Sequence, residues 1–383
     1  MKSTWRIGRV MPGRLVAIAL ALMLASAPAV ADIKSFNTAM KDRDYARATS
    51  AAASAWSTLD KSRDDLAIIA REFSFAAYLA GDYSAARAYG EAAVAASATL
   101  GEEPVLRAAS EVLQRVAEFK LAPSGVMRDK LYAALATRAD LPGVDLAAYM
   151  AADAMTAFDF DRGAWKEASA SAALGVRLSS AGGGAFLIYA YRFELFENVA
   201  AYMTTRDVKP FERLTALKQK IIATIEASPS DEVAAPFANF YWEVSAWHNS
   251  TGMHLVNRRK MQWPEADASE ERSQLNDRTV RMLGFRTGPD SCYSVIDMKR
   301  NIEYPSSALY KGLIGTVILR VDIDDKGAAA NPEILTSVPA KYFGEAVLKG
   351  VKDIRYKPGD KWSSDCSLAQ PQLVVTFQFM IGG

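Results

Sequence analysis

The spacing of apolar residues changes near Pro289, and this change constrains the fold more than any other feature of the chain. Before Pro289, apolar residues recur every three or four positions, which places them on one face of an α-helix. After Pro289 they recur every second position in several segments, as in half-buried β-strands. We therefore predict an all-α N-terminal domain followed by a small α+β domain. A chain of 383 residues with 50% apolar residues is long enough for two cores.

The N-terminal region has the composition of a helical domain. From Asp32 to about Ser228 it is rich in Ala, Leu, Glu, Lys and Arg, which favour helices. Glycine and proline interrupt it at 101–104, 141–143 and 180–184, and the segments between these breaks are as long as single helices. We predict a helical domain over residues 32–230.

A short pattern recurs in this region, directly after three of its turns. An aromatic residue is followed three positions later by alanine, at Tyr45 and Ala48, Tyr83 and Ala86, and Trp165 and Ala168. The alanine would let two antiparallel helices approach closely, while the ring fills the space at their open end. Residues 73–93 resemble a tetratricopeptide repeat, with matching positions at Gly81, Asp82, Tyr83, Ala86, Tyr89 and Ala93. We therefore predict that the domain over residues 32–230 consists of helical repeats similar to tetratricopeptide repeats. The alternative is an alanine-rich bundle without true repeats, which would also contain such triplets.

The first 31 residues have the features of an export signal. An apolar run from Leu15 to Ala27 follows the basic residues and precedes Pro28 and the cleavage pattern Ala29-Val30-Ala31; the basic residues are Lys2, Arg6, Arg9 and Arg14. We expect the mature protein to begin at Asp32, in the periplasm. The alternative is an uncleaved anchor in the inner membrane, because an apolar stretch of about 17 residues could just span a bilayer.

The chain contains two cysteines, Cys292 and Cys366. Export to an oxidising compartment favours a disulfide between them, which we predict. Two free thiols in a core are the alternative. A disulfide needs Cα atoms within about 7 Å of each other, and this distance does not follow from the sequence.

Between residues 231 and 288 we expect a last helix and a linker, with an exposed stretch from Glu265 to Asp277. Both histidines, His248 and His254, lie in this segment, six positions apart. A spacing of three or four positions is needed to place two imidazoles on one helical face, and no cysteine or acid completes a set of metal ligands. We therefore expect no metal site.

The C-terminal domain, predicted over residues 289–383, begins its strand pattern at Gly315. From Gly315 to Ile323 the residues alternate, with Val317, Leu319, Val321 and Ile323 on one face and Thr316, Ile318, Arg320 and Asp322 on the other. The segment Asp324–Gly327 is typical of a hairpin turn, in which glycine can adopt positive φ. A second strand is expected from about Asn331 to Ser337, with Pro332 indicating an irregular or edge start.

A helix and a last strand are expected to complete the domain. Apolar residues have helical spacing from Phe343 to Ile354, and we expect the helix to end at Arg355–Pro358. A final strand is predicted from Leu373 to Met380, with Val375, Phe377 and Phe379 on one face.

From about Ile302 to its end, the chain resembles the TonB C-terminal domain of energy-transducing periplasmic proteins. Tyr304-Pro305, Ala308, Gly312 and Gly315 resemble the lead-in of that family. Val321-Asp322 and Gly327 match the first hairpin of the family, and Ser337 matches the serine that closes its second strand. The signature that follows the family's helix is matched by Ile354-Arg355-Tyr356-Lys357-Pro358. The resemblance implies a three-stranded antiparallel sheet packed on helix.

The resemblance also implies a mode of binding. Members of the family pair an extended segment of an outer-membrane transporter with their exposed last strand, and an edge strand offers unpaired N–H and C=O groups for this. The partner-binding residues implied here are Tyr304, Pro305, Leu373, Val374, Val375, Thr376, Phe377, Gln378 and Phe379. Val375, Phe377 and Phe379 are expected in the core. A partner would therefore contact the backbone together with the side chains of Val374, Thr376 and Gln378.

Two features of the family are missing. Its membrane anchor typically carries a serine and a histidine, whereas the apolar run here contains Ser26 and no histidine. The 15 prolines are scattered and form no extended linker of the kind that spans the periplasm. We therefore expect a periplasmic adaptor, whose partner is a periplasmic or outer-membrane protein such as a TonB-dependent transporter. The alternative is a membrane-anchored energy transducer that acts on such transporters.

Other classes of function have little support in the sequence. A net charge of +1 provides no basic field for nucleic acid. We find no G-x-S-x-G motif and no Cys/His pair with a nearby base, and paired acids such as Asp231-Glu232 are typical of helix starts. We expect no enzyme activity, no cofactor and no small-molecule substrate.

Overall fold

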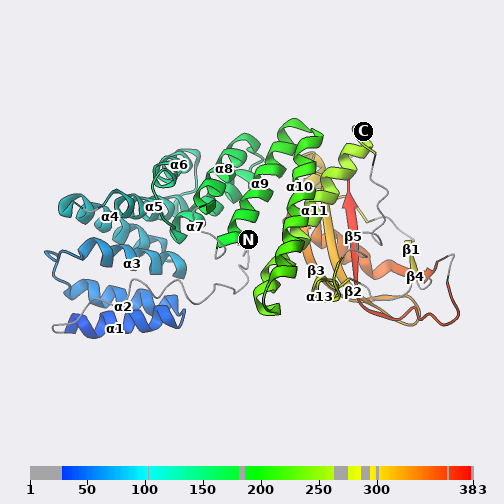
Figure 1. Ribbon diagram of the computed structural model, residues 1–383, viewed down its shortest axis with the longest axis horizontal. Helices are drawn as coiled ribbons and strands as arrows, with labels where there is room; N and C mark the ends of the chain where they lie inside the picture. Colours follow the sequence, from blue (N-terminus) through cyan, green and yellow to red (C-terminus); the bar gives the residue numbers. More distant parts are fainter. Residues whose placement is uncertain are drawn as a thin grey trace. The chain divides into compact units, whose positions relative to one another are not determined.

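The computed structural model describes residues 28–101, 103–180, 186–262, 275–285, 294–298, 302–359 and 362–380. Contacts within the chain divide it into two compact units, Met1–Ala200 and Ala201–Gly383. The first unit is helical, and the second contains long helices and two small sheets (Figure 1). No helix in the described ranges is both long and apolar enough to cross a membrane.

The first unit is built from helices that pack against their neighbours in the sequence. The helices are α1 (Pro28–Lys41), α2 (Tyr45–Thr58), α3 (Leu66–Ala80), α4 (Tyr83–Leu100), α5 (Pro104–Leu121), α6 (Gly125–Ala139), α7 (Leu146–Asp161), α8 (Trp165–Ser180) and α9 (Leu187–Thr205), the last of which ends in the second unit. Alternate helices also touch, as α3 does with α5 and α5 with α7. The predicted helical N-terminal region is confirmed.

Three of the helix pairs share one turn geometry. Arg43, Gly81 and Gly163 have φ angles of 59°, 80° and 69°, and in each case the next N–H donates to the carbonyl five residues earlier, as in a Schellman-type helix end. The alanine of each triplet, at Ala48, Ala86 and Ala168, is completely buried. The pair α5–α6 is joined instead by Ala122, Pro123 and Ser124, whose hydroxyl accepts from Met127 N–H. The turn between α5 and α6 lacks the pattern of an aromatic residue followed three positions later by alanine.

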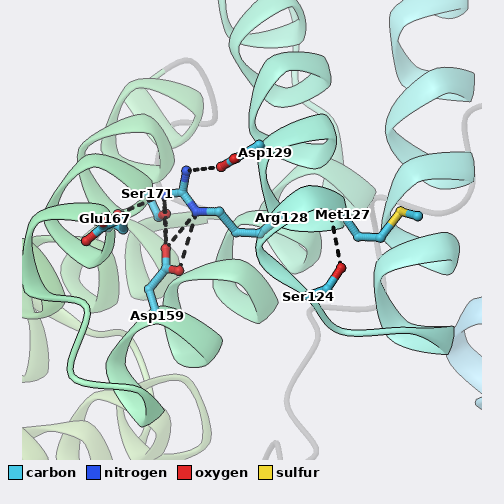
Figure 2. Close-up of polar contacts among 7 residues, drawn as sticks. All are labelled: Ser124, Met127, Arg128, Asp129, Asp159, Glu167 and Ser171. Carbon is cyan, nitrogen blue, oxygen red and sulfur yellow. Dashed lines mark hydrogen bonds and ion pairs between the residues drawn. The ribbon is translucent and has the colours of Figure 1, made fainter.

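A buried polar network joins α6, α7 and α8 (Figure 2). The Arg128 guanidinium lies 3.0 Å from Asp159 Oδ2 and donates to Ser171 Oγ at 2.9 Å and to the Glu167 carbonyl at 3.1 Å. Ser171 in turn donates to Asp159 at 2.8 Å. Since Asp159 is only 2% exposed, loss of one partner would leave a charge buried, which costs about 3–5 kcal/mol. The network fixes the mutual arrangement of these three helices.

The second unit begins with an antiparallel helix pair, α10 (Val208–Ala227) and α11 (Asp231–Asn257). The Ser230 hydroxyl caps α11 by accepting from Val233 N–H. The shorter helices are α13 (Asp277–Leu283), α14 (Ser306–Tyr310) and α15 (Gly344–Gly350), and a 3-10 turn follows α15 at Val351–Asp353. Helix α11 contacts all three strands of the larger sheet.

The larger sheet is the predicted three-stranded antiparallel sheet. Its central strand is β2 (Gly315–Ile323), flanked by β3 (Ala329–Val338) and β5 (Gln370–Phe379), in the order β3-β2-β5. The prediction of such a sheet with an adjoining helix is confirmed.

A second sheet was not predicted. It consists of β1 (Ser294–Met298) paired antiparallel with β4 (Ile354–Pro358). The expectation that the segment Arg355–Pro358 ends the preceding helix is wrong, because α15 already ends at Gly350 and the segment is a strand. Strand β4 is held at the hairpin turn by the Tyr356 N–H, which donates to the Gly327 carbonyl at 2.7 Å. Pairing with remote residues thus decides its conformation.

The two faces of the larger sheet are covered differently. One face packs into a core with Phe343, Val347 and Val351, and it carries Val317, Leu319, Val321 and Ile323. On the other face, Thr316 and Ile318 are 0% and 1% exposed, and the Thr316 hydroxyl lies 2.6 Å from that of Ser250 on α11. A helix that precedes the predicted C-terminal domain therefore covers part of its sheet.

Two glycines predicted at the start of β2 and in the hairpin turn are required by their surroundings. A Cβ atom at Gly315 would lie 2.1 Å from the Phe343 ring and 2.4 Å from the Val338 carbonyl oxygen. Gly327 has a φ of 77°, and a Cβ atom there would lie 2.0 Å from the Tyr356 carbonyl oxygen. These contacts let the ring pack against β2 and the hairpin turn dock on β4.

Candidate partner-binding edge

Strand β5 forms one edge of the three-stranded sheet. It pairs with β2 in unbroken register from Leu373, opposite Val321, to Phe379, opposite Gly315. Among the described strands, none pairs with its other side. Outward backbone N–H and C=O groups on such an edge can bond to an added strand.

The side chains of β5 alternate between the core and the surface. Val375, Phe377 and Phe379 are 8%, 8% and 5% exposed and belong to the core. Thr376 and Gln378 are exposed. A strand added at this edge could therefore meet the backbone and these two polar side chains without disturbing the core.

The first residues of the predicted binding strand are less accessible. Leu373 packs against the core and is half-buried. Val374 points to the other face, where a Cβ atom built on Gly284, the C-cap of α13, would lie 3.8 Å from its Cγ2. The accessible part of the predicted edge is thus its C-terminal half.

Tyr304, one of the two residues predicted as a second contact for the partner, lies next to Phe379 at the C-terminal end of β5. The Tyr304 ring meets Phe379 and Phe343 edge-on, with centroids 5.7 and 5.6 Å apart. Its hydroxyl donates to the Leu313 carbonyl, and burial raises the pKa of this hydroxyl. Pro305 precedes α14, and its carbonyl accepts from Ala308 N–H and from Leu309 N–H. The ring of Tyr304 thus supports the strand from the core side.

Asp322 fixes both outer strands at the hairpin end of the sheet. Its carboxylate accepts from Asn331 Nδ2 at 3.0 Å and from the Gln372 N–H at 2.9 Å, and these hydrogen bonds lower its pKa. Asn331 on β3 and Gln372 on β5 have positive φ angles of 47° and 55°. The pairing of β2 shifts register next to Asp322 on both sides. Sequence reasoning placed Asp322 within the hairpin motif but assigned it no such role.

Two large apolar side chains near the lead-in are exposed and were not among the predicted residues. Leu309 and Tyr310, at the end of α14, are 51% and 93% exposed. Their signal in the sequence was their position, four and five residues after Pro305.

The cysteine prediction lies partly outside the described residues. Cys366 is described, and its N–H donates to the Ser363 carbonyl at 3.1 Å. Cys292 falls outside the described ranges, so the Cys292–Cys366 disulfide stays a prediction. The predicted export signal also falls outside them, apart from residues 28–31 at the start of α1, and it stays a prediction.

The histidines are engaged in separate contacts. The His248 ring stacks on Phe211, with centroids 4.5 Å apart, and its Nε2 lies 3.0 Å from the Thr215 hydroxyl. His254 lies beside Tyr202, with 2.6 Å between Nδ1 and the hydroxyl oxygen. Within the described ranges, no three side chains of His, Cys, Asp or Glu are grouped so that they could hold a metal ion.

The segment from α14 to β5, which contains the three-stranded sheet and α15, matches a known family of domains. Residues 300–377 match the family model described as Gram-negative bacterial TonB protein C-terminal. The chain contains a TonB C-terminal domain. No curated protein matches the chain.

The match gives the TonB domain its boundaries within the second unit. It includes β2, β3, α15, β4 and most of β5, and excludes α10, α11 and β1. Because α11 covers one face of the sheet, the compact unit of this protein is larger than the matched domain.

Proposed function

We propose that this is a periplasmic protein-interaction protein whose TonB domain binds an extended segment of a partner by strand addition at β5. The observation that carries the proposal is the unbroken register of β5 beside β2, with no described strand on its outer side. The exposed side chains of Thr376 and Gln378 support it. Main-chain bonds would supply most of the affinity, while the two side chains add modest specificity.

The domain and the predicted export signal support the class of partner that we propose. TonB domains belong to proteins of the Gram-negative envelope, and the predicted signal over residues 1–31 would release the mature chain into the periplasm. We propose a periplasmic or outer-membrane protein as the partner, such as a TonB-dependent transporter. The helical unit would be a second binding scaffold, because stacked helix pairs present an extended surface.

The alternative is a membrane-anchored energy transducer, and the family match is the observation that keeps it open. The two functions differ in the fate of the N-terminal segment. Mass spectrometry of protein purified from an envelope fraction would show an N-terminus at Asp32 for the adaptor. An intact Leu15–Ala27 segment would favour the transducer.

Photo-crosslinking at single positions tests the strand-addition mechanism. Deleting β5 is unsuitable, because the deletion would also remove three core side chains. A benzoyl-phenylalanine would instead replace the exposed Thr376 or Gln378, and the matched control would replace the exposed Glu333 on β3. We expect one envelope protein to crosslink from both β5 positions and not from Glu333. Crosslinking of that protein from Glu333 alone would exclude β5 as the binding edge.

A further inference from the structure

A hydrogen-bonded group of basic and aromatic side chains lies where α9 and α11 end, within the second unit. The Arg258 Nε–H donates to His254 Nε2 at 3.2 Å, and His254 Nδ1 lies 2.6 Å from the Tyr202 hydroxyl oxygen. The Arg206 guanidinium lies over the Tyr202 ring, 5.4 Å from its centroid. Lys260 Nζ donates to the Arg206 carbonyl at 2.8 Å. We call this group the cationic cluster.

The hydrogen bonds of the cluster determine the proton position on its histidine. A guanidinium can only donate, so His254 Nε2 accepts from Arg258 and the neutral ring carries its proton on Nδ1. Nδ1 then donates to the Tyr202 oxygen. The remaining hydrogen-bonding capacity of the cluster is mainly donor capacity on Arg206, Arg258 and Lys260.

The cluster has more positive than negative charge among the described residues. Among the described residues, the Asp207 carboxylate contacts the cluster, 3.6 Å from Lys260 Nζ. The half-buried Arg206 has Met203 Sδ as a partner, at 3.1 Å. Burial and the charges of Arg206, Arg258 and Lys260 lower the pKa of His254 to about 4, and burial also lowers the pKa of Arg206. Both shifts indicate burial of these groups next to like charges.

Capping of helix ends explains only part of this arrangement. Cations near a helix C-terminus are stabilising by about 0.3–1 kcal/mol, and Lys260 satisfies the backbone carbonyl of Arg206 in this way. Capping does not require the Arg206 side chain to lie half-buried near Arg258, a like charge. Partial burial of a charge next to a like charge is costly, and an oxyanion would offset this cost through bidentate bonds to guanidinium.

We propose that Arg206, Arg258 and Lys260 form a binding site for an oxyanion, the carboxylate or phosphate group of a ligand. The site lies beyond the C-terminal end of β5, because Asn257 Nδ2 at the end of α11 is 3.4 Å from Met380 Sδ. Figure 1 shows the end of α11 close to the end of β5. If strand addition at β5 is correct, an acidic side chain of the added segment is the ligand, and this second step rests on the proposed function.

The two histidines provide a direct test of the site by NMR. Sulfate, which keeps a constant charge across the range, would be titrated into the mature protein at fixed ionic strength, and the ring resonances of His248 and His254 would be followed with pH. We expect saturation at millimolar sulfate and a rise of about one unit or more in the pKa of His254, a tenfold change in proton affinity. Addition of sulfate should leave the His248 resonances unchanged at each pH. Succinate in a parallel titration would show whether carboxylate is also accepted.

Variants separate binding from general salt effects. Arg258→Gln, on an exposed side chain, should weaken the sulfate response at least tenfold, while Arg213→Gln on the exposed surface of α10 should leave it unchanged. An equal response in both variants, or no saturable shift of His254, would overturn the proposal. This titration contains no partner protein, so its failure is independent of strand addition. If sulfate binds but Arg258→Gln leaves crosslinking from Gln378 unchanged, the acidic partner residue is excluded.

Discussion

The two edges of the TonB sheet differ in regularity. Strand β3 shifts its register against β2 twice, after Ile318 and after Arg320, and it contains Pro332 beside the positive-φ residue Asn331. Strand β5 keeps one register from Leu373 to Phe379, and its shift lies at its N-terminal end. Bulges and proline are devices by which edge strands avoid pairing with other chains. The comparison shows one protected edge and one edge left suitable for pairing.

The largest expected effect distinguishes the two faces of β5. Phe377→Ala should lower the stability of the second unit by about 3–5 kcal/mol, because it removes a buried ring. Thr376→Ala should change stability by less than about 0.5 kcal/mol, because that side chain is exposed. Urea unfolding monitored by circular dichroism would measure both. If the two variants lost similar amounts of stability, the Thr376 side chain would be buried within the protein and unavailable to a partner.

A smaller effect is expected at the hairpin turn that leads into the protected edge. Gly327→Ala should destabilise the unit by more than about 1–2 kcal/mol, since it combines a left-handed backbone with a clash at the Tyr356 carbonyl. The exposed neighbour Lys326 provides a control, because Lys326→Ala should be nearly neutral. Thermal unfolding of both variants checks this. A stable Gly327→Ala variant would argue against docking of the turn on β4.

The smallest effect concerns the carboxylate that joins both edges. The pKa of Asp322 is lowered below its ordinary 3.8 by hydrogen bonds from Asn331 and Gln372. The carboxylate therefore contributes stability above pH 3.8, and this contribution is lost as the pH falls through the lower folded value. Asp322→Asn should lower the melting temperature at pH 7, and the difference from wild type should shrink toward pH 3. A difference that is constant with pH would show that the two hydrogen bonds to Asp322 do not depend on its charge.

Local patterns in the sequence predicted much of this fold. The alternation in Gly315–Ile323 and Leu373–Phe379 predicted β2 and β5, and glycine at position 327 predicted the hairpin turn. In the helical unit, the aromatic and alanine triplets identified three of the turns, where neighbouring residues determine the geometry. The α5–α6 turn was missed because it lacks the aromatic and alanine triplet. Ser124 caps α6 as Asp44 and Asp82 cap α2 and α4, but no left-handed residue precedes it.

The remaining features depend on residues that are far apart in the sequence. Strand β4 exists because Ile354–Pro358 pairs with Ser294–Met298, and its five residues show too short a pattern to distinguish a strand from a helix end. The contact between Ser250 and Thr316 places α11 on the sheet. The cationic cluster joins Arg206 to Arg258, which the sequence separates by two helices. Such pairings leave no local signal.

Amide hydrogen exchange tests strand addition most directly. The partner identified by crosslinking would be added to the mature protein, and exchange would be followed by NMR for each amide of β3 and β5. We predict that outward amides of β5 between Val374 and Phe379 become protected, because they donate to the added strand, while those of β3 keep their rates. Protection confined to β3, or binding without any change in β5, would contradict the account.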